Sequence, residues 1–206
     1  MKKVRVLIAD DHTVVRIGLT ALLESQPDIE VVGEADNGVA AVREAVRLQP
    51  DVVVMDLMMP RMDGVEATAE LRRKVPAAKV VILTSYSTAD GIAHAIDAGA
   101  VGALTKTADD SSLLSAIRIV AGGERFISPR IAQMLQESPP VPTLTGKQRE
   151  ILESMARGLS NVDIARQLDI SPTVVREHIT TILEKIGAAN RTEAVAIALR
   201  KQLLQA

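Results

Sequence analysis

The fold of this chain is read first from Val52-Val53-Val54-Met55-Asp56-Leu57-Met58-Met59-Pro60-Arg61-Met62-Asp63-Gly64, where a short apolar run leads into an acidic, turn-forming segment. Successive apolar residues, mostly β-branched, are typical of a strand buried on both faces of a parallel sheet. Similar runs occur at residues 4–9, 29–33, 80–83 and 101–104, and helical patterns separate them. This alternation predicts an α/β fold with a doubly wound, five-stranded parallel sheet.

A proline-rich segment, Ser138-Pro139-Pro140-Val141-Pro142, marks the clearest boundary in the chain. Proline cannot continue a helix, so this segment favours a stiff, extended connector. We therefore expect one domain over residues 1–125 and a linker over residues 126–142, with a short helix after Ser128-Pro129. Residues 143–206 have only helical patterns and form the expected second domain.

Composition excludes several classes of protein. The absence of cysteine removes disulfides, thiolate metal sites and cysteine nucleophiles. No apolar run approaches the ~18 residues needed to span a bilayer, and the first ten residues lack a signal-peptide cleavage site, so we expect a cytoplasmic protein without membrane contact. Residues 143–206 hold nine Lys/Arg and seven Asp/Glu, a slightly basic balance compatible with DNA binding.

Four of the expected strands end in polar residues. Strand one is followed by Asp10-Asp11, strand three by Asp56, strand four by Thr84 and strand five by Lys106. Ligands of doubly wound sheets bind beyond these strand ends, so the side chains should gather there. Three carboxylates repel one another unless a cation is present, and oxygen ligands indicate Mg²⁺. The set is suited to forming an aspartyl phosphate.

Each of these residues alone has an ordinary structural explanation. Asp11 could cap a helix, Asp56 could begin a turn, Thr84 could bond to backbone, and Lys106 could be a solvated charge. Their order on strands one, three, four and five makes coincidence improbable.

Together, these residues and the stretch through Gly64 resemble the receiver domain of two-component response regulators. The resemblance implies that Asp56 accepts a phosphoryl group from a histidine kinase. It implies that Asp10, Asp11, Asp56 and the backbone carbonyl of Met58 surround Mg²⁺, with Asp10 reaching the ion through water. Thr84 and Lys106 would contact the phosphoryl oxygens.

Two positions depart from the receiver pattern. Ala103 stands where most receivers have an aromatic residue three positions before the lysine, and Thr107 stands where proline is common. A cis bond before Thr107 would cost ~2.5–4 kcal/mol and is not expected. We expect Tyr86, or the loop that carries it, to replace the missing aromatic signal; the competing possibility is a switch that works by backbone movement alone.

The last part of the chain has clear helix-start signals. Thr145 with Gln148, and Asn190 with Glu193, form expected capping boxes, while Ser160 and Ser171-Pro172 are expected N-caps. The short turn between the second and third helices has helix-turn-helix spacing. Stretches 160–171, 175–182 and 191–195 resemble the LuxR-type four-helix DNA-binding domain, and with the receiver this indicates the NarL/FixJ class of response regulators.

The third helix of this domain should face DNA. Arg176 could read guanine or hold phosphate, Glu177 could accept from cytosine, and Val174 could touch a thymine methyl group. The full set of expected DNA contacts is Ser171, Thr173, Val174, Arg176, Glu177, Thr180 and Lys185. From composition alone, a protein-binding four-helix module with a polar third helix is equally compatible.

We therefore expect a non-enzymatic transcription factor that is phosphorylated by a sensor histidine kinase and binds promoter half-sites as a homodimer. Ala194, Ala198 and Leu199 either form a contact between dimer partners or pack in their own core. The alternatives are a regulator that switches without phosphate and a Mg²⁺-dependent phosphohydrolase of the haloacid dehalogenase type. The phosphohydrolase ranks far behind, because its nucleophile follows strand one.

Overall fold

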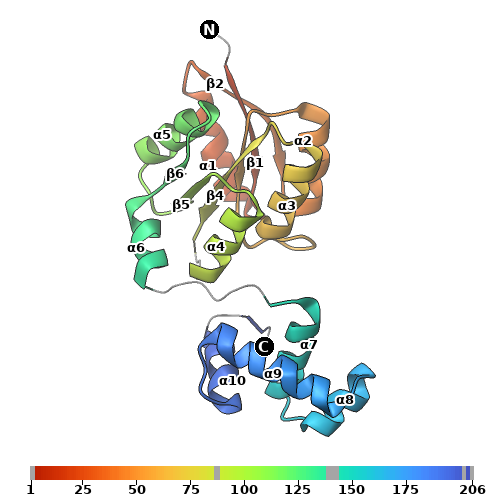
Figure 1. Cartoon of the computed structure of the whole chain (residues 1–206). Helices are drawn as coiled ribbons and strands as arrows, with labels where there is room; N and C mark the ends of the chain where they lie inside the picture. Colours follow the sequence, from red (N-terminus) through yellow and green to blue (C-terminus); the bar gives the residue numbers. More distant parts are fainter. Residues whose placement is uncertain (1–2, 86–88, 138–143, 201–202, 205–206) are drawn as a thin grey trace. The chain divides into compact units, whose positions relative to one another are not determined.

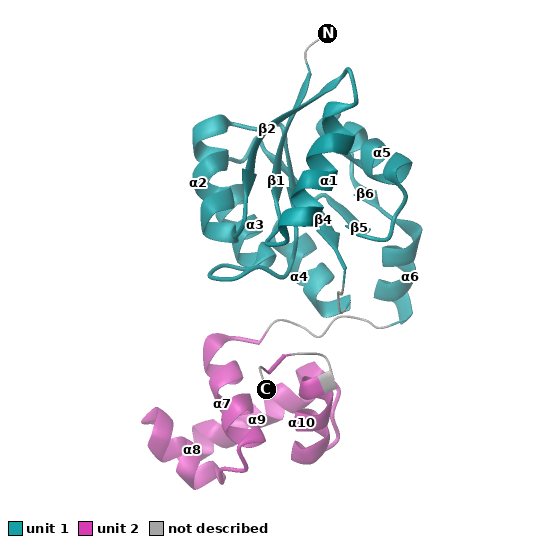
Figure 2. Ribbon diagram, turned by 180° about the vertical axis from the view of Figure 1, so that it is seen from behind, with its two compact units in different colours: residues 1–139 teal, residues 140–206 magenta. Residues whose placement is uncertain are grey.

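The computed structural model describes residues 3–85, 89–137, 144–200 and 203–204 and forms two compact units, residues 1–139 and 140–206 (Figure 2). Each unit has its own hydrophobic core. The expected proline-rich connector, residues 138–142, lies outside the described residues.

The first unit contains a parallel sheet whose strand order is β2-β1-β3-β4-β5-β6 (Figure 1). The strands are β1 (Val4–Ala9), β2 (Ile29–Ala35), β3 (Val52–Met55), β4 (Lys79–Thr84), β5 (Gly102–Thr105) and β6 (Phe126–Ile127). The first five match the expected flavodoxin-like sheet within two residues at each end. The expectation of only five strands was wrong, because β6 has two residues and is too short to show a periodic pattern.

Helices cover both faces of this sheet. They are α1 (Thr13–Glu24), α2 (Gly38–Leu48), α3 (Gly64–Lys74), α4 (Ala89–Ala98), α5 (Asp110–Ala121) and α6 (Pro129–Glu137). One buried cluster joins the sheet to α2, α3, α4 and α6, and another joins its opposite face to α1 and α5. The strand order accounts for the separation of α1 from α2, α3 and α4, because the chain moves outward from β1 to β2 and then back through β3 to β5.

The short segment after α5 is an integral part of the first unit. β6 pairs with β5, and the Ser128 N–H donates to the Ala103 carbonyl oxygen at 3.0 Å. α6 follows at once and packs against α4 and β5 through the fully buried side chain of Ile131. The expected short helix therefore exists, and it is docked on the sheet.

The second unit is helical. Its helices are α7 (Gly146–Ala156), α8 (Asn161–Leu168), α9 (Pro172–Ile186) and α10 (Arg191–Arg200). The Thr145/Gln148 capping box is present, and Ser160 and Ser171 cap α8 and α9 as expected. Among the described residues, no helix combines the length and apolar character needed to cross a membrane.

The last helix, α10, ends at Arg200, and Leu204 beyond it is buried in the core of the unit. Ala194 and Ala198 are fully buried within that same core, so they are packing residues, whereas Leu199 is exposed.

Candidate functional site

Asp56 lies directly after β3, at the edge of the sheet where the parallel strands end. Its N–H donates to the Ala9 carbonyl oxygen at 2.8 Å, and the residue is only 4% exposed. The loop after it folds back closely: a Cβ atom at Gly64 would lie 2.2 Å from the Asp56 carbonyl oxygen. Glycine at position 64 therefore allows α3 to begin against the backbone of Asp56.

Asp10 and Asp11 follow the neighbouring strand β1. Asp10 is buried, whereas Asp11 is open to solvent. Arg16 of α1 donates from Nη1 to the Asp10 carbonyl oxygen at 2.7 Å, and the His12 N–H donates to Asp10 Oδ1 at 2.9 Å. The N-cap residue of α1 is His12, so Asp11 is not the cap of that helix.

Lys106, which follows β5, reaches across the strand ends to both buried aspartates. Its Nζ lies 2.8 Å from Asp56 Oδ2 and also hydrogen-bonds Asp10 Oδ2. The Lys106 side chain is only 11% exposed, so it is not the solvated charge that its sequence position alone would suggest. Lys106 therefore holds two carboxylates of like charge close together.

Burial and this ion-pair network act on the pKa values in opposite directions. Burial raises the pKa of Asp56, although the hydrogen bond and charge of Lys106 oppose the increase. Burial by itself would lower the pKa of Lys106, but its hydrogen bonds to Asp10 and Asp56 raise the pKa overall. Lys106 therefore remains an ammonium at neutral pH.

The acidic cluster has the donor atoms of a cation site. One ligand atom each from Asp10, Asp11, His12 and Asp56 lies within 4.8 Å of the others. Carboxylate oxygens suit a hard divalent cation such as Mg²⁺. The His12 ring is mostly exposed, and its Nδ1 lies 2.7 Å from Asp11 Oδ1. The residues present therefore fit a divalent cation held by the three carboxylates.

Thr84 completes the set at the end of β4. It is 1% exposed, and its carbonyl oxygen accepts a hydrogen bond from the Lys106 N–H at 2.8 Å. Tyr86, the expected substitute for the missing aromatic residue, lies outside the described residues. The peptide bond between Lys106 and Thr107 is trans, as expected.

Ala103, the position of the missing aromatic residue, is fully buried beside α6. It belongs to the same buried cluster as Ile131, and Ile127 of β6 pairs with it in register. α6 thus contributes apolar side chains to the face of β5 on which Ala103 lies.

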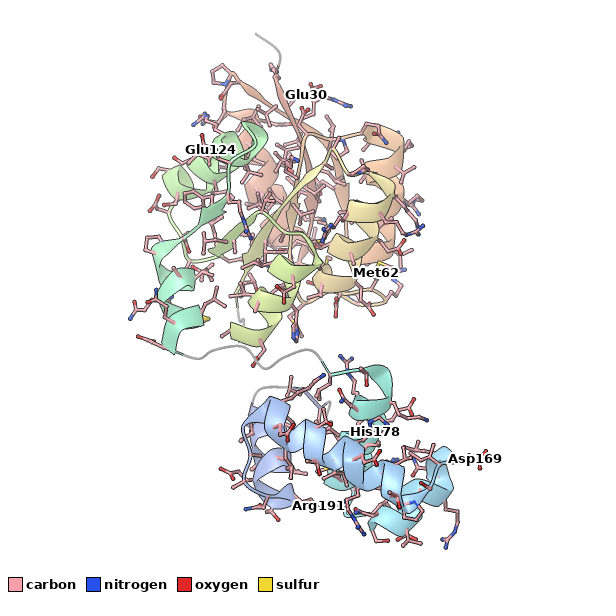
Figure 3. All side chains as sticks on the ribbon, viewed as in Figure 1. Glu30, Met62, Glu124, Asp169, His178 and Arg191 are labelled. Carbon is pink, nitrogen blue, oxygen red and sulfur yellow. The ribbon has the colours of Figure 1, made fainter. Side chains whose placement is uncertain are left out.

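In the second unit, α9 presents a polar face. Thr173, Arg176, Glu177 and Thr180 are exposed, Val174 is half-buried, and Ser171 is exposed at the N-cap. Lys185 is different, because the residue is half-buried and its Nζ donates to Gln148 Oε1 at 3.0 Å, which joins α9 to α7. Figure 3 shows His178 on α9 and Arg191 at the start of α10. The Arg191 guanidinium donates to the Leu159 carbonyl oxygen and to Asn161 Oδ1, and these bonds connect α10 to the start of α8.

Both units match known families. Residues 6–118 match the response regulator receiver domain, and residues 142–198 match the bacterial regulatory proteins of the luxR family. The chain belongs to the two-component response regulators with a LuxR-type DNA-binding domain.

Relatives of similar length support this assignment. The response regulator is 41% identical to the transcriptional regulatory protein LiaR of Bacillus subtilis, over 98% of this chain and 99% of LiaR. It is 37% identical to the response regulator protein VraR of Staphylococcus aureus, over 98% and 99% of the two chains. The crystal structure of response regulator ChrA, from a heme-sensing two-component system, is 38% identical with a TM-score of 0.59, over 99% of this chain and all of that one.

Sequence reasoning missed two supporting residues of this response regulator, His12 and Arg16, and it missed the contact of a third, Gly64, with Asp56. His12 has no distinctive spacing, and only its position after Asp10 and Asp11 placed it near the cluster. Arg16 lies one helical turn into α1, so its reach back to Asp10 depends on how α1 packs. Gly64 was noticeable as a glycine at a helix start, but its contact with Asp56 depends on the loop conformation.

Proposed function

We propose that Asp56 accepts a phosphoryl group from a sensor histidine kinase in a Mg²⁺-dependent reaction, and that this controls DNA binding by the second unit. The supporting observation is the buried carboxylate of Asp56 at the strand ends, with the Lys106 ammonium 2.8 Å away and Asp10 and Asp11 beside it. The receiver and LuxR-type families to which the units belong are consistent with this role.

Each residue has a distinct role in the proposal. A carboxylate oxygen of Asp56 attacks phosphorus; the new P–O bond forms as the P–N bond to the kinase histidine breaks, and the released imidazole takes a proton from solvent. Asp10, Asp11, Asp56 and the Met58 carbonyl oxygen would hold Mg²⁺, which when bound supplies positive charge near the phosphoryl oxygens. The ammonium of Lys106 and the hydroxyl of Thr84 would then meet those oxygens.

A mass measurement tests the acceptor. Full-length protein incubated with Mg²⁺ and acetyl phosphate should gain one phosphoryl group, and the gain should be lost with a chelator or in Asp56→Asn. Asp110→Asn is the matched control, because Asp110 is an exposed aspartate in the first turn of α5. An undiminished gain in Asp56→Asn would refute the assignment. No gain in the wild-type protein would favour a regulator that switches without phosphate.

We further propose that the phosphorylated protein acts in the cytoplasm as a homodimer on two DNA half-sites about one helical turn apart. One short recognition helix gives a small footprint, so pairing two of them is the usual way to obtain affinity. The exposed face of α9, with Ser171 and Thr173 at its start, supports a role in reading the major groove. Because Lys185 already contacts Gln148, it contributes mainly to domain packing in this proposal.

Two arginine variants distinguish recognition of the DNA sequence by α9 from the general attraction of positive charge to DNA. Arg176→Ala should weaken binding to a target half-site pair by roughly ten- to a hundredfold, since a bidentate base contact contributes about 1–3 kcal/mol. Arg149→Ala removes another exposed charge, from α7, and serves as the control. Equal losses in the two variants, measured by fluorescence anisotropy on specific and scrambled DNA, would contradict recognition by α9.

A further inference from the structure

A concave site lies at the opposite end of the receiver sheet from Asp56. It has a volume of about 380 Å³, within the range of small-molecule pockets. Its walls come from α3, the start of β4, the end of α4 and the segment before β6. Lys79 begins β4 and Val101 precedes β5, whereas Asp56 and Lys106 follow strand ends, so the two sites are separated by the length of the parallel strands.

The charge of this pocket is one-sided. Its lining includes Arg72, Lys79 and Arg125 and no aspartate or glutamate. Within the described part of the chain, none of the three forms an ion pair. The Arg72 guanidinium makes one long hydrogen bond, 3.5 Å, to the backbone carbonyl oxygen of Asp97. Both arginines are exposed, so their guanidinium groups are accessible to a ligand.

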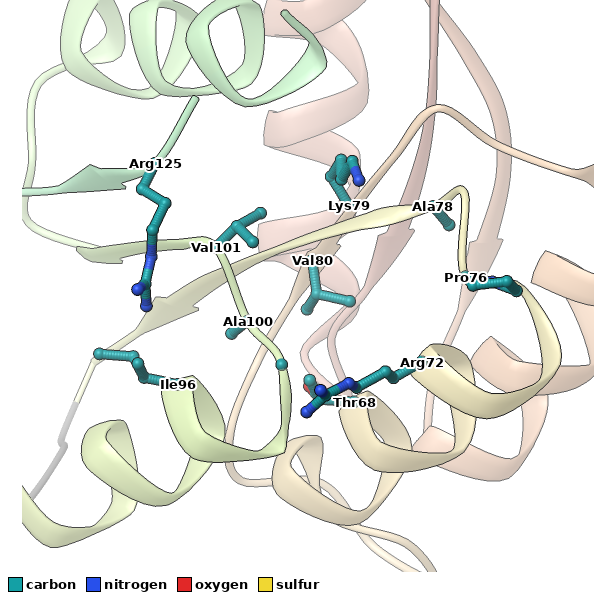
Figure 4. Close-up of a pocket in the computed structure, with 11 residues that line it drawn as sticks. Thr68, Arg72, Pro76, Ala78, Lys79, Val80, Ile96, Ala100, Val101 and Arg125 are labelled. Atoms are coloured by element: carbon teal, nitrogen blue, oxygen red, sulfur yellow. The ribbon is translucent and has the colours of Figure 1, made fainter. Parts of the chain in front are cut away.

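The position of Arg72 depends on a glycine. Gly99 has φ of +125°, and a Cβ atom there would lie 2.8 Å from Arg72 Cδ. The missing side chain allows the stem of Arg72 to lie over the turn between α4 and β5. Figure 4 shows Arg72 and Arg125 approaching the hollow from two sides, with Ala100 and Val80 between them.

The floor of the pocket is apolar. Val80 and Ala100 are buried, and Ile96 is half-buried. A ligand would therefore place an apolar body on this floor and an anionic group beside a guanidinium, which binds carboxylate or phosphate oxygens through paired N–H donors.

We propose that this pocket, the Arg72–Arg125 pocket, binds a small organic anion that combines an apolar body with a carboxylate or phosphate head group. Such a ligand would bridge α3 to the segment that leads into β6 and α6. This proposal does not depend on phosphorylation of Asp56.

Titration calorimetry on the full-length protein tests the proposal. The probes are benzoate and phenylphosphonate, whose P–C bond prevents phosphoryl transfer, and benzyl alcohol is the neutral analogue. We expect saturable one-to-one binding of at least one anion, and roughly tenfold or greater weakening in Arg72→Gln and in Arg125→Gln, because each variant loses a charge-assisted hydrogen bond. Arg73→Gln is the matched control on α3; its side chain pairs with Glu70.

Amide chemical shifts in the ¹⁵N-labelled full-length protein locate the site independently. Binding should move the resonances of Gly99, Ala100 and Val101 and leave that of Asp56 in place. Three results would overturn the proposal: no saturable binding of either anion, equal binding of benzyl alcohol, or anion binding unchanged in both arginine variants. Binding of benzoate alone or of phenylphosphonate alone supports it and identifies the head group.

Discussion

Ile131 offers the sharpest test of how phosphorylation of Asp56 affects DNA binding, because its side chain joins α6 to the sheet. Its side chain is fully buried in the cluster that contains Ala103, in a receiver where Ala103 replaces the usual aromatic residue. Truncating a fully buried isoleucine to alanine costs about 2–5 kcal/mol. We expect Ile131→Ala to lower the free energy of unfolding of the receiver unit by this amount, measured by urea denaturation.

The same variant should lose coupling as well as stability. We expect Ile131→Ala to take up phosphate at Asp56 normally but to show little phosphate-dependent gain in DNA affinity. The control is Ile117→Ala, which truncates a fully buried isoleucine of α5 on the opposite face of the sheet. Ile117→Ala should lower the free energy of unfolding by a similar amount and keep the phosphate-dependent gain in DNA affinity. A normal phosphate-dependent gain in DNA affinity in Ile131→Ala would refute the expectation that α6 couples phosphorylation to DNA binding.

A double-mutant cycle measures the contact itself. Ala103→Phe introduces an aromatic ring beside Ile131 and should destabilise the unit by about 1–3 kcal/mol through overpacking. In Ala103→Phe/Ile131→Ala the ring has room, so the combined loss should be smaller than the sum by about 0.5–3 kcal/mol. Strictly additive losses would mean that the two positions do not share space.

Three further outcomes are expected. Lys106→Met leaves two buried carboxylates without their cation and should cost about 3–5 kcal/mol at neutral pH, measured by urea denaturation. Burial raises the pKa of Asp56 in the folded state, so the folded state binds the proton more tightly than the unfolded state does. The loss of unfolding free energy in Lys106→Met should therefore shrink as pH falls. A loss that grows towards acidic pH would be the contrary result. Gly64→Ala should reduce both thermal stability and phosphate uptake, since its Cβ would lie 2.2 Å from a backbone oxygen, whereas Gly18→Ala has no atom within 4 Å and should reduce neither. Tyr86→Ala should keep phosphate uptake and lose phosphate-induced dimerisation, measured by analytical ultracentrifugation; unchanged dimerisation would exclude Tyr86 from the switch.

Much of the fold was predictable because its signals are local. A buried parallel strand needs successive apolar residues, and the five runs, including Val52–Met55, mark β1 to β5 closely. Helix starts depend on one side chain and the N–H groups that follow it, so Thr145, Ser160 and Ser171 were identifiable as caps. The strand-end set was also predictable, since parallel strands end at one edge, and the structure does bring Asp10, Asp56 and Lys106 together there.

Other features depended on the tertiary structure, because they join residues with no local pattern. Two-residue β6 pairs with the edge of β5, and α6 packs against β5 with Ile131 in the same buried cluster as Ala103. Likewise, the reach of Lys106 to two carboxylates, the contact of Gly64 with Asp56 and the convergence of Arg72 and Arg125 each depend on distances between separate elements. Sequence determines which groups stand at each strand end and helix start, and packing determines which of those groups meet.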